Sequence, residues 1–185
     1  HLTKFRKQQP GSACREIESP RIHIQRICVR LMKGKKTMKI AIGCDPNAQE
    51  AKEELITFMK QKQYGEITDF GSADPIYANP AIRVAQAVAA GDYDRGIIIC
   101  GTGIGVSISA NKVKGAYAAL LSDVYSAKRA RLSNDANIAC MGAFTTGSKL
   151  REELVDAFLS NEFVPGCASQ PKVDAFVEYE TAHCS

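Results

Sequence analysis

The chain has 185 residues, which is enough for one α/β domain with its own core and short for two. Its net charge of +4 is unevenly spread, because residues 1–38 carry ten Lys or Arg against two Glu, whereas the remainder carries fourteen against eighteen acidic residues. The acidic body excludes a nucleic-acid-binding surface there, and no stretch approaches the roughly 18 apolar residues of a membrane span, so we expect a cytoplasmic protein.

Residues 1–37 form a basic segment that contains Pro10 and Pro20 and has no sustained apolar period. We predict a disordered or artificially added leader, with an Arg-rich targeting peptide as the alternative. The catalytic domain is then expected over residues 38–163. Residues 164–185 show little pattern and are expected to form a tail that packs on a partner subunit.

Beyond the leader, apolar runs alternate with helical patterns. Strands are predicted at residues 39–44, 67–70, 96–100, 116–121 and 137–141, and helices at residues 48–62, 80–90, 104–112, 122–132 and 148–159, the last being the final regular helix. Pro80 suits the start of one helix, and Ser122 suits the cap of another. Residues 96–100 (GIIIC) are apolar throughout, as in a strand covered on both faces. The pattern predicts a doubly wound, mostly parallel α/β sheet of five strands with helices on both faces.

The most informative motif is the segment CGTGIG at residues 100–105, which we call the glycine loop. It follows the most apolar strand and opens a helix, at the edge of the sheet where ligands bind in such folds. Three glycines at alternate positions allow several backbone N–H groups to point at one anion, beside the positive end of the helix dipole. A dinucleotide loop is the alternative, with Asp123 as the ribose-binding acid. However, the spacing is GxGxG rather than GxGxxG, with Val106 in place of the last glycine.

A thiol beside such a loop is suited to proton transfer. The positive field favours the thiolate of Cys100, and the N–H groups can stabilise the enediolate that forms when a proton moves between C1 and C2 of a sugar. This chemistry needs no metal or cofactor. The local residues fit a simple phosphate-binding loop with an inert buried cysteine as well, and this alternative stays open.

The other cysteines carry no comparable signal. The seven cysteines of the chain have no CxxC pair and no short metal-binding spacing, so neither a disulfide framework nor a zinc site is predicted. Cys44, Cys100 and Cys140 each end an apolar run, and we interpret two of these three as small buried apolar residues.

Three segments make the chain similar to the ribose-5-phosphate isomerase B and galactose-6-phosphate isomerase family: MKIAIGCD, the run from DRGIIICGTGIG to SNDANI, and VDAFLSNEF. The similarity extends from about Met38 to Lys172. The resemblance implies a Rossmann-like sheet of strand order 2-1-3-4-5 and a homodimer, or a tetramer, whose active site is shared between subunits. It also implies metal-free isomerisation of a sugar phosphate.

The resemblance also implies roles for individual residues. Cys100 would move the C1/C2 proton, Thr102 would polarise or relay, and Gly101, Gly103 and Gly105 would hold the enediolate. Asp45, Tyr77, Asn111 and Asn134 would contact the substrate. From local chemistry alone, Asp45 and Thr102 can equally be helix caps, and Tyr77 can be a packing residue.

The chain departs from the family at three places. Pro46 and Ser133 stand where the family has His, and the Arg-rich tail that grips phosphate is reduced to Lys172. Because the second of these His residues is expected to open a furanose ring, two interpretations follow. The substrate is either a four-carbon sugar phosphate such as erythrulose 4-phosphate, which cannot close that ring, or ribose 5-phosphate with Ser133, Asp135 or water as the acid. Galactose 6-phosphate and a non-catalytic phosphosugar-binding module are the remaining alternatives.

Overall fold

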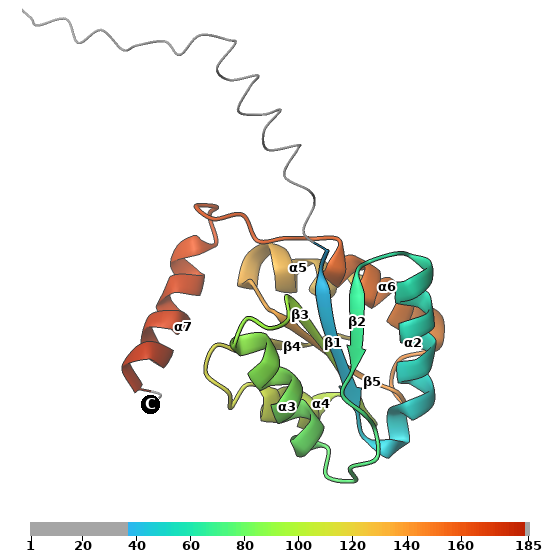
Figure 1. The fold of residues 1–185 in the computed structure, drawn as a ribbon. Coiled ribbons are helices and arrows are strands. Elements are labelled where there is room, and N and C mark those ends of the chain that lie inside the picture. Colours follow the sequence, from blue (N-terminus) through green and yellow to red (C-terminus); the bar gives the residue numbers. More distant parts are fainter. Residues whose placement is uncertain (1–36, 184–185) are drawn as a thin grey trace, which may run out of the picture. The chain divides into compact units, whose positions relative to one another are not determined.

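The computed structural model describes residues 37–183, so the expectation for the leader lies outside the described residues except at its last position. One five-stranded sheet, in which every strand is parallel to its neighbours, forms the centre (Figure 1). Its strands are β1 (Lys39–Cys44), β2 (Glu66–Asp69), β3 (Arg95–Cys100), β4 (Ala118–Leu120) and β5 (Ile138–Gly142). The helical elements are η1 (Pro46–Ala48), α2 (Gln49–Gln61), α3 (Ala78–Ala89), α4 (Ile104–Ala110), α5 (Val124–Asn134), α6 (Ser148–Leu159) and α7 (Gln170–His183). The predicted α/β class and five strands are confirmed.

The strand order is β2-β1-β3-β5-β4, so the order 2-1-3-4-5 implied by the resemblance is wrong in its last two strands. The difference follows from burial. All five residues of β5 are buried, as a strand with two neighbours requires, whereas the three residues of β4 are only partly buried or exposed. The short strand therefore takes the edge.

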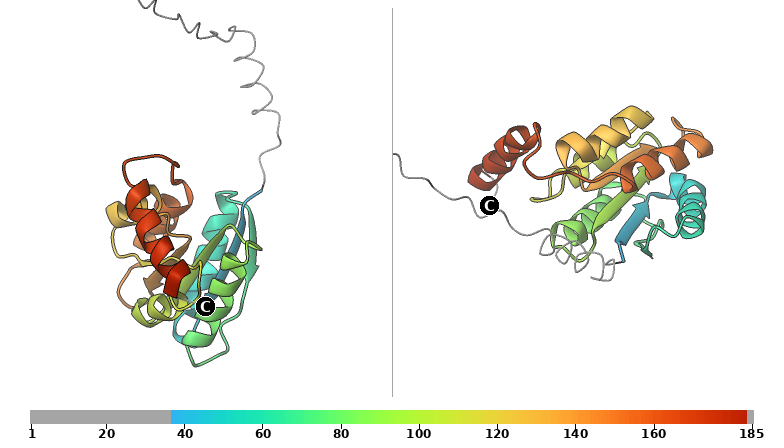
Figure 2. Two further views of the ribbon diagram at one scale, coloured as in Figure 1. Left: turned by 90° about the vertical axis from the view of Figure 1, so that its left-hand side faces the viewer. Right: turned by 90° about the horizontal axis from the view of Figure 1, so that it is seen from above.

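Helices cover both faces of the sheet (Figure 2), and the side chains of alternating strand residues belong to two separate cores. On one face, Ile97 and Ile99 pack with residues of α2, α5 and α6. On the other face, Ile98 and Cys100 pack with residues of α3 and α4. The chain thus leaves β1 and β3 toward opposite sides, and the carboxyl ends of these two neighbouring strands form the switch point where doubly wound folds bind ligands.

Helix α5 begins differently from the prediction. Asp123, not Ser122, is its N-cap, and the Asp123 carboxylate accepts hydrogen bonds from the backbone N–H (2.7 Å) and the hydroxyl (2.6 Å) of Ser126. These bonds lower the pKa of Asp123. A carboxylate is the stronger cap here because it accepts both donors at once. The same bonds explain Asp123 without a ribose, which removes its support for a dinucleotide loop.

The prediction that residues 148–159 form the last regular helix is wrong, because α7 follows. Pro171 lies in its first turn, where a missing N–H has no cost, and Val173 is its only buried residue. Phe176 packs edge-on against Tyr117 at 5.1 Å between ring centroids, and the Glu180 carboxylate accepts from the Tyr117 hydroxyl at 2.8 Å. A helix with one buried residue has almost no apolar period, which is why the sequence pattern failed to show it. None of the helices described within residues 37–183 has the length and apolar character to cross a membrane.

Candidate active site

The thiol of Cys100 lies inside the turn that follows it. β3 ends at Cys100, and the chain turns through Gly103, whose φ of 79° places it in the left-handed region, before α4 begins. The turn brings the Gly103 N–H to 3.1 Å from the Cys100 sulfur, to which it donates. Cys100 is 5% exposed, so its sulfur sits at the base of the glycine loop. The first N–H groups of α4 lack intrahelical acceptors and face the same turn.

All three glycines of the loop are closely packed. A methyl group on Gly103 would lie 2.6 Å from Leu120 Cδ1 and 2.7 Å from the Met141 carbonyl carbon. On Gly105 it would lie 2.5 Å from the Tyr77 ring, and on Gly101 it would lie 3.0 Å from the Phe144 ring. At Gly103, glycine is therefore required by space as well as by backbone conformation, whereas at Gly101 and Gly105 a side chain would have to displace a ring.

Asp45 and Thr102 lie at the same edge and make capping contacts. The Asp45 carboxylate is buried and accepts from the Asn47 N–H at 3.1 Å, while the Asp45 N–H donates to the Ile99 carbonyl at 3.3 Å. The Thr102 hydroxyl accepts from the Ile104 N–H at 3.4 Å, a long bond. The structure thus brings both residues to Cys100, and their roles toward a substrate stay predictions.

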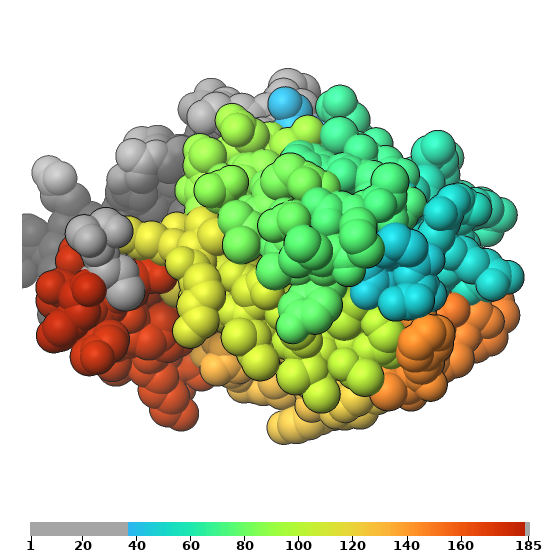
Figure 3. Space-filling view, turned by 90° about the horizontal axis from the view of Figure 1, so that it is seen from below, coloured from blue at the N-terminus to red at the C-terminus, as the bar shows by residue number. Residues whose placement is uncertain are grey.

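The loop between β5 and α6, residues 143–147, is called the supporting loop here because it makes two backbone hydrogen bonds to the start of the glycine loop. The Ala143 N–H donates to the Cys100 carbonyl at 2.8 Å, and the Phe144 N–H donates to the Gly101 carbonyl at 2.9 Å. Figure 3 views this edge of the sheet and shows the segments that follow β1 (blue) and β5 (orange) side by side. Phe144 could not be predicted from the sequence, because an isolated aromatic residue in a loop carries no motif.

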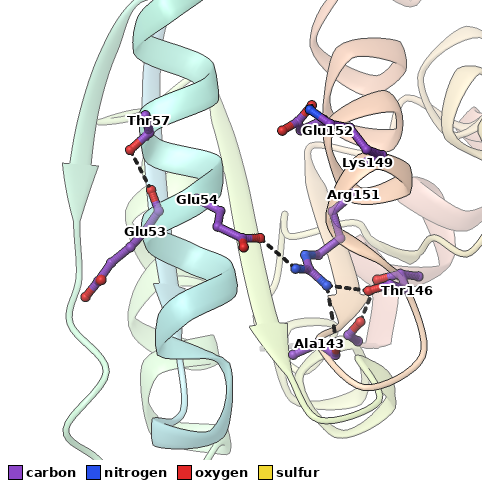
Figure 4. A network of polar contacts seen from close by, with 9 residues as sticks. Glu53, Glu54, Thr57, Ala143, Thr146, Lys149, Arg151 and Glu152 are labelled. Atoms are coloured by element: carbon purple, nitrogen blue, oxygen red, sulfur yellow. Dashed lines mark hydrogen bonds and ion pairs between the residues drawn. The ribbon is translucent and has the colours of Figure 1, made fainter.

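The buried side chain of Arg151, paired with the exposed Glu54, fixes this supporting loop (Figure 4). Arg151, which is 7% exposed, pairs with the Glu54 carboxylate of α2 at 2.8 Å. Its guanidinium also donates to the carbonyls of Ala143 (3.4 Å) and Thr146. A cleft of about 480 Å³ lies between the loop and α2, and residues lining it include Asn47, Glu50, Phe144, Thr145 and Ser148.

Replacing Arg151 with methionine is expected to lower both stability and turnover. The substitution leaves the two carbonyls without their donor, which costs about 1–3 kcal/mol in the free energy of unfolding. It also loosens the loop that holds Cys100 and Gly101. Thermal unfolding and steady-state kinetics measure the two effects. Lys149→Met on the same helix is the control, because Lys149 forms only an exposed ion pair with Glu152. Equal effects of the two substitutions would contradict the assigned role.

The other two strand cysteines behave as buried apolar residues. Burial raises the pKa of Cys44 to about 11. Burial also raises the pKa of Cys140. Both side chains are fully buried, as expected for the two of these three cysteines that were interpreted as small buried apolar residues. Within residues 37–183, no three His, Cys, Asp or Glu side chains are grouped as a metal site would require.

Four predicted site residues are not brought to Cys100 within one chain. Asn111 ends α4, and its side chain bonds both the N–H and the carbonyl of Ala118 at 2.8 Å, where β4 begins. Ser133 and Asn134 end α5, four to five residues before β5 begins at Ile138, which is opposite Gly96 in the sheet. They lie at the amino end of the strands, whereas Cys100 lies at the carboxyl end. Lys172 belongs to α7, which contacts the segment before β4.

Comparison with known proteins identifies the family. The family described as Ribose/Galactose Isomerase matches residues 40–176. The chain belongs to this family. It is therefore an isomerase, and the resemblance predicted from the three sequence segments is confirmed. A protein of Listeria innocua named ribose-5-P isomerase B is 51% identical over 146 residues, which cover 77% of this chain and 97% of that protein.

Two further relatives of this isomerase show which sugar phosphates occur in the names of family members. A protein of Pectobacterium atrosepticum named D-erythrulose-4-phosphate isomerase is 42% identical over 147 residues, which cover 77% of this chain and 95% of that protein. The structure of ribose-5-phosphate isomerase B from Clostridium thermocellum is 40% identical, with a TM-score of 0.73 over 78% of this chain and 99% of that one. The family therefore includes relatives named for sugars of four and of five carbons.

Proposed function

We propose that the chain interconverts an aldose phosphate and its ketose through an enediolate, with Cys100 as the group that moves the proton. The observation that carries the proposal is the 3.1 Å contact between the Cys100 sulfur and the Gly103 N–H. It places a proton-accepting sulfur within a loop of backbone donors, where both the thiolate and a developing oxyanion are stabilised.

The reaction requires two proton transfers at carbon. Starting from the open-chain ketose, the thiolate takes a proton from C1, and the electrons of the broken C–H bond form the C1–C2 double bond while the C2 oxygen becomes an oxyanion. The N–H groups of the glycine loop stabilise that oxygen. The thiol then returns the proton to C2, and the C1 oxygen becomes the aldehyde. Movement of the hydroxyl proton between the two oxygens is assigned to Thr102, which belongs to the same loop and follows Cys100 by two residues. No metal or cofactor takes part in this scheme.

Ribose 5-phosphate is the proposed substrate, supported by the 51% identical relative of that name. Erythrulose 4-phosphate is the second candidate. It is favoured by Pro46 and Ser133 in place of His, and by the relatives named for it. The Ser133 hydroxyl accepts from Arg129 of the same helix, and this bond would hold it in place as a ring-opening acid.

Assay of the purified protein on both sugars separates these candidates. We expect turnover of ribose 5-phosphate, with deuterium from solvent appearing at the reacting carbon in NMR spectra. A Ser133→Ala variant should then be impaired on ribose 5-phosphate, which closes a ring. Turnover of erythrulose 4-phosphate alone would contradict ribose 5-phosphate as the substrate and would identify a substrate that stays in the open-chain form. Absence of exchange with either sugar or with galactose 6-phosphate would favour a binding module instead.

We also propose that a second copy of the chain completes the site. The proposal is supported by Ser133, Asn134 and Lys172, which are predicted to contact substrate and do not meet Cys100 within one chain. Ile76, Tyr77, Ile104 and Ile108 are exposed apolar side chains near the site that a second subunit can cover. Sedimentation should give twice the mass of the chain, and Ile108→Asp should lower both the mass and the turnover. A fully active monomer would contradict this assembly.

A further inference from the structure

We propose that the ring of Phe144 forms the wall of the active site against which the carbon chain of the sugar packs, and that it limits the length of the sugar. This inference rests on the proposed function, because it concerns the sugar that the glycine loop would hold. It assigns a specificity-determining role to a residue that the glycine-loop chemistry does not use.

The ring of Phe144 lies over the start of the glycine loop. A methyl group on Gly101 would lie 3.0 Å from Cδ2 and 3.1 Å from Cε2 of Phe144, so the ring covers the residue that follows Cys100. The Phe144 N–H donates to the Gly101 carbonyl at 2.9 Å, which fixes the backbone from which the ring projects. In the proposed binding mode, a sugar whose C1 and C2 reach the Cys100 sulfur lies beside this ring.

The ring is also largely open to solvent. The side chain of Phe144 is 74% exposed, and its ring lies against Gly101. Large apolar side chains gain free energy when covered, so a ring fixed in place with a free face is suited to contact a ligand. Phe144 also borders the cleft of about 480 Å³, where Asn47, Thr145 and Ser148 offer partners for hydroxyl groups. A sugar chain presents both kinds of surface, since its C–H groups pack on a ring while its hydroxyls form hydrogen bonds.

The charges around the ring decide which part of the substrate it contacts. Behind the supporting loop, the guanidinium of Arg151 is paired with Glu54 at 2.8 Å and buried, so it is not free for a phosphate. Phe144 itself is uncharged. The ring is therefore assigned to the carbon chain rather than to the phosphate.

A second ring bounds the loop at its other end. The Tyr77 ring lies over Gly105 and is 46% exposed. The glycine loop thus lies between Tyr77 at one end and Phe144 at the other. A bulky ring one residue away from Cys100 leaves limited room for carbons beyond the reacting pair, and removing it should admit longer sugars.

The test compares Phe144→Ala and Phe144→Leu with the unchanged protein on sugar phosphates of four, five and six carbons. For the best substrate, Phe144→Ala should raise KM about tenfold and change kcat less than threefold, because the lost contact is made equally in the ground state and the transition state. For the next longer sugar, kcat/KM relative to the best one should rise about tenfold. Phe144→Leu should recover most of the original selectivity.

Tyr125→Ala is the matched control, because Tyr125 on α5 is also 74% exposed and should change neither quantity. An equal fall in kcat for every sugar, with the ratio between sugars unchanged, would mean that the ring only packs on Gly101 and would overturn the inference. If the unchanged protein converts none of the sugars, the proposed function fails and the inference fails with it. If the unchanged protein is active and Phe144→Ala has the same kinetics, the inference about Phe144 is wrong while the proposed function stands.

Discussion

Replacing Cys100 with alanine is expected to lower kcat for isomerisation by about 10²- to 10⁴-fold, the range that a general acid–base group contributes. The sulfur is the only thiol at the carboxyl edge of the described sheet that a loop N–H meets, at 3.1 Å. Substrate binding should persist, because the glycine loop keeps its backbone donors. Rate measurements combined with calorimetric titration of the sugar phosphate separate the two effects. Loss of exchange between solvent deuterium and the reacting carbon should accompany the loss of rate.

Cys140→Ala provides the control for this experiment. Cys140 is a buried thiol on the same face of the sheet, in the strand beside β3, so both substitutions remove one sulfur from the same core. Cys140→Ala should reduce stability to a similar degree while leaving kcat within about twofold, since the Cys140 thiol is fully buried in the core and no loop N–H among the described residues donates to it. If Cys100→Ala kept most of the activity, the glycine loop would be a phosphate-binding loop with an inert cysteine.

Local patterns in the sequence predicted the elements and the loop, because both depend on neighbouring residues. The apolar run of β3 followed by three alternate glycines specifies a strand, a tight turn and a helix start, and all three are present. The order of β4 and β5 depends instead on which strand is buried by the rest of the chain. Helix α7 likewise depends on Tyr117, which is more than fifty residues away from it and supplies the contacts of Phe176 and Glu180.

In the candidate site, too, some residues could be predicted from their neighbours in the sequence, whereas others depend on contacts between distant segments. Cys100 and its glycines could be predicted from the sequence because they are consecutive, and Asp45 was predicted from the resemblance. Phe144 reaches Gly101 only through the pairing of β3 with β5 and the bonds that the supporting loop makes to the Cys100 and Gly101 carbonyls. Ser133 and Asn134 were predicted from the resemblance, and a single chain holds them at the other end of the sheet. Their assignment therefore depends on the assembly rather than on the fold.

Replacing Gly103 with alanine should abolish most activity and destabilise the fold, because the substitution disturbs the turn that holds the Cys100 sulfur. The φ of 79° alone costs an alanine about 1–2 kcal/mol. The added methyl group would also lie 2.6 Å from Leu120 and 2.7 Å from the backbone of Met141, and the backbone atom cannot move aside as a side-chain end can. The turn must therefore shift, and with it the N–H that donates to the sulfur. Denaturant unfolding and kcat are the measurements.

The variant Gly91→Ala serves to separate the cost of the left-handed backbone from the cost of the steric overlap in Gly103→Ala. Gly91 has a φ of 80°, nearly equal to that of Gly103, and a methyl group there meets no atom within 4 Å. It follows α3 and lies outside the glycine loop. The two substitutions should share the cost of the left-handed conformation, and any excess loss in Gly103→Ala then measures the overlap with Leu120 and Met141. Gly103 donates to the Cys100 sulfur and Gly91 does not, so Gly91→Ala should retain the kcat of the unchanged protein. If both variants lost the same stability and both kept full activity, the turn at Gly103 would not be what positions the thiol.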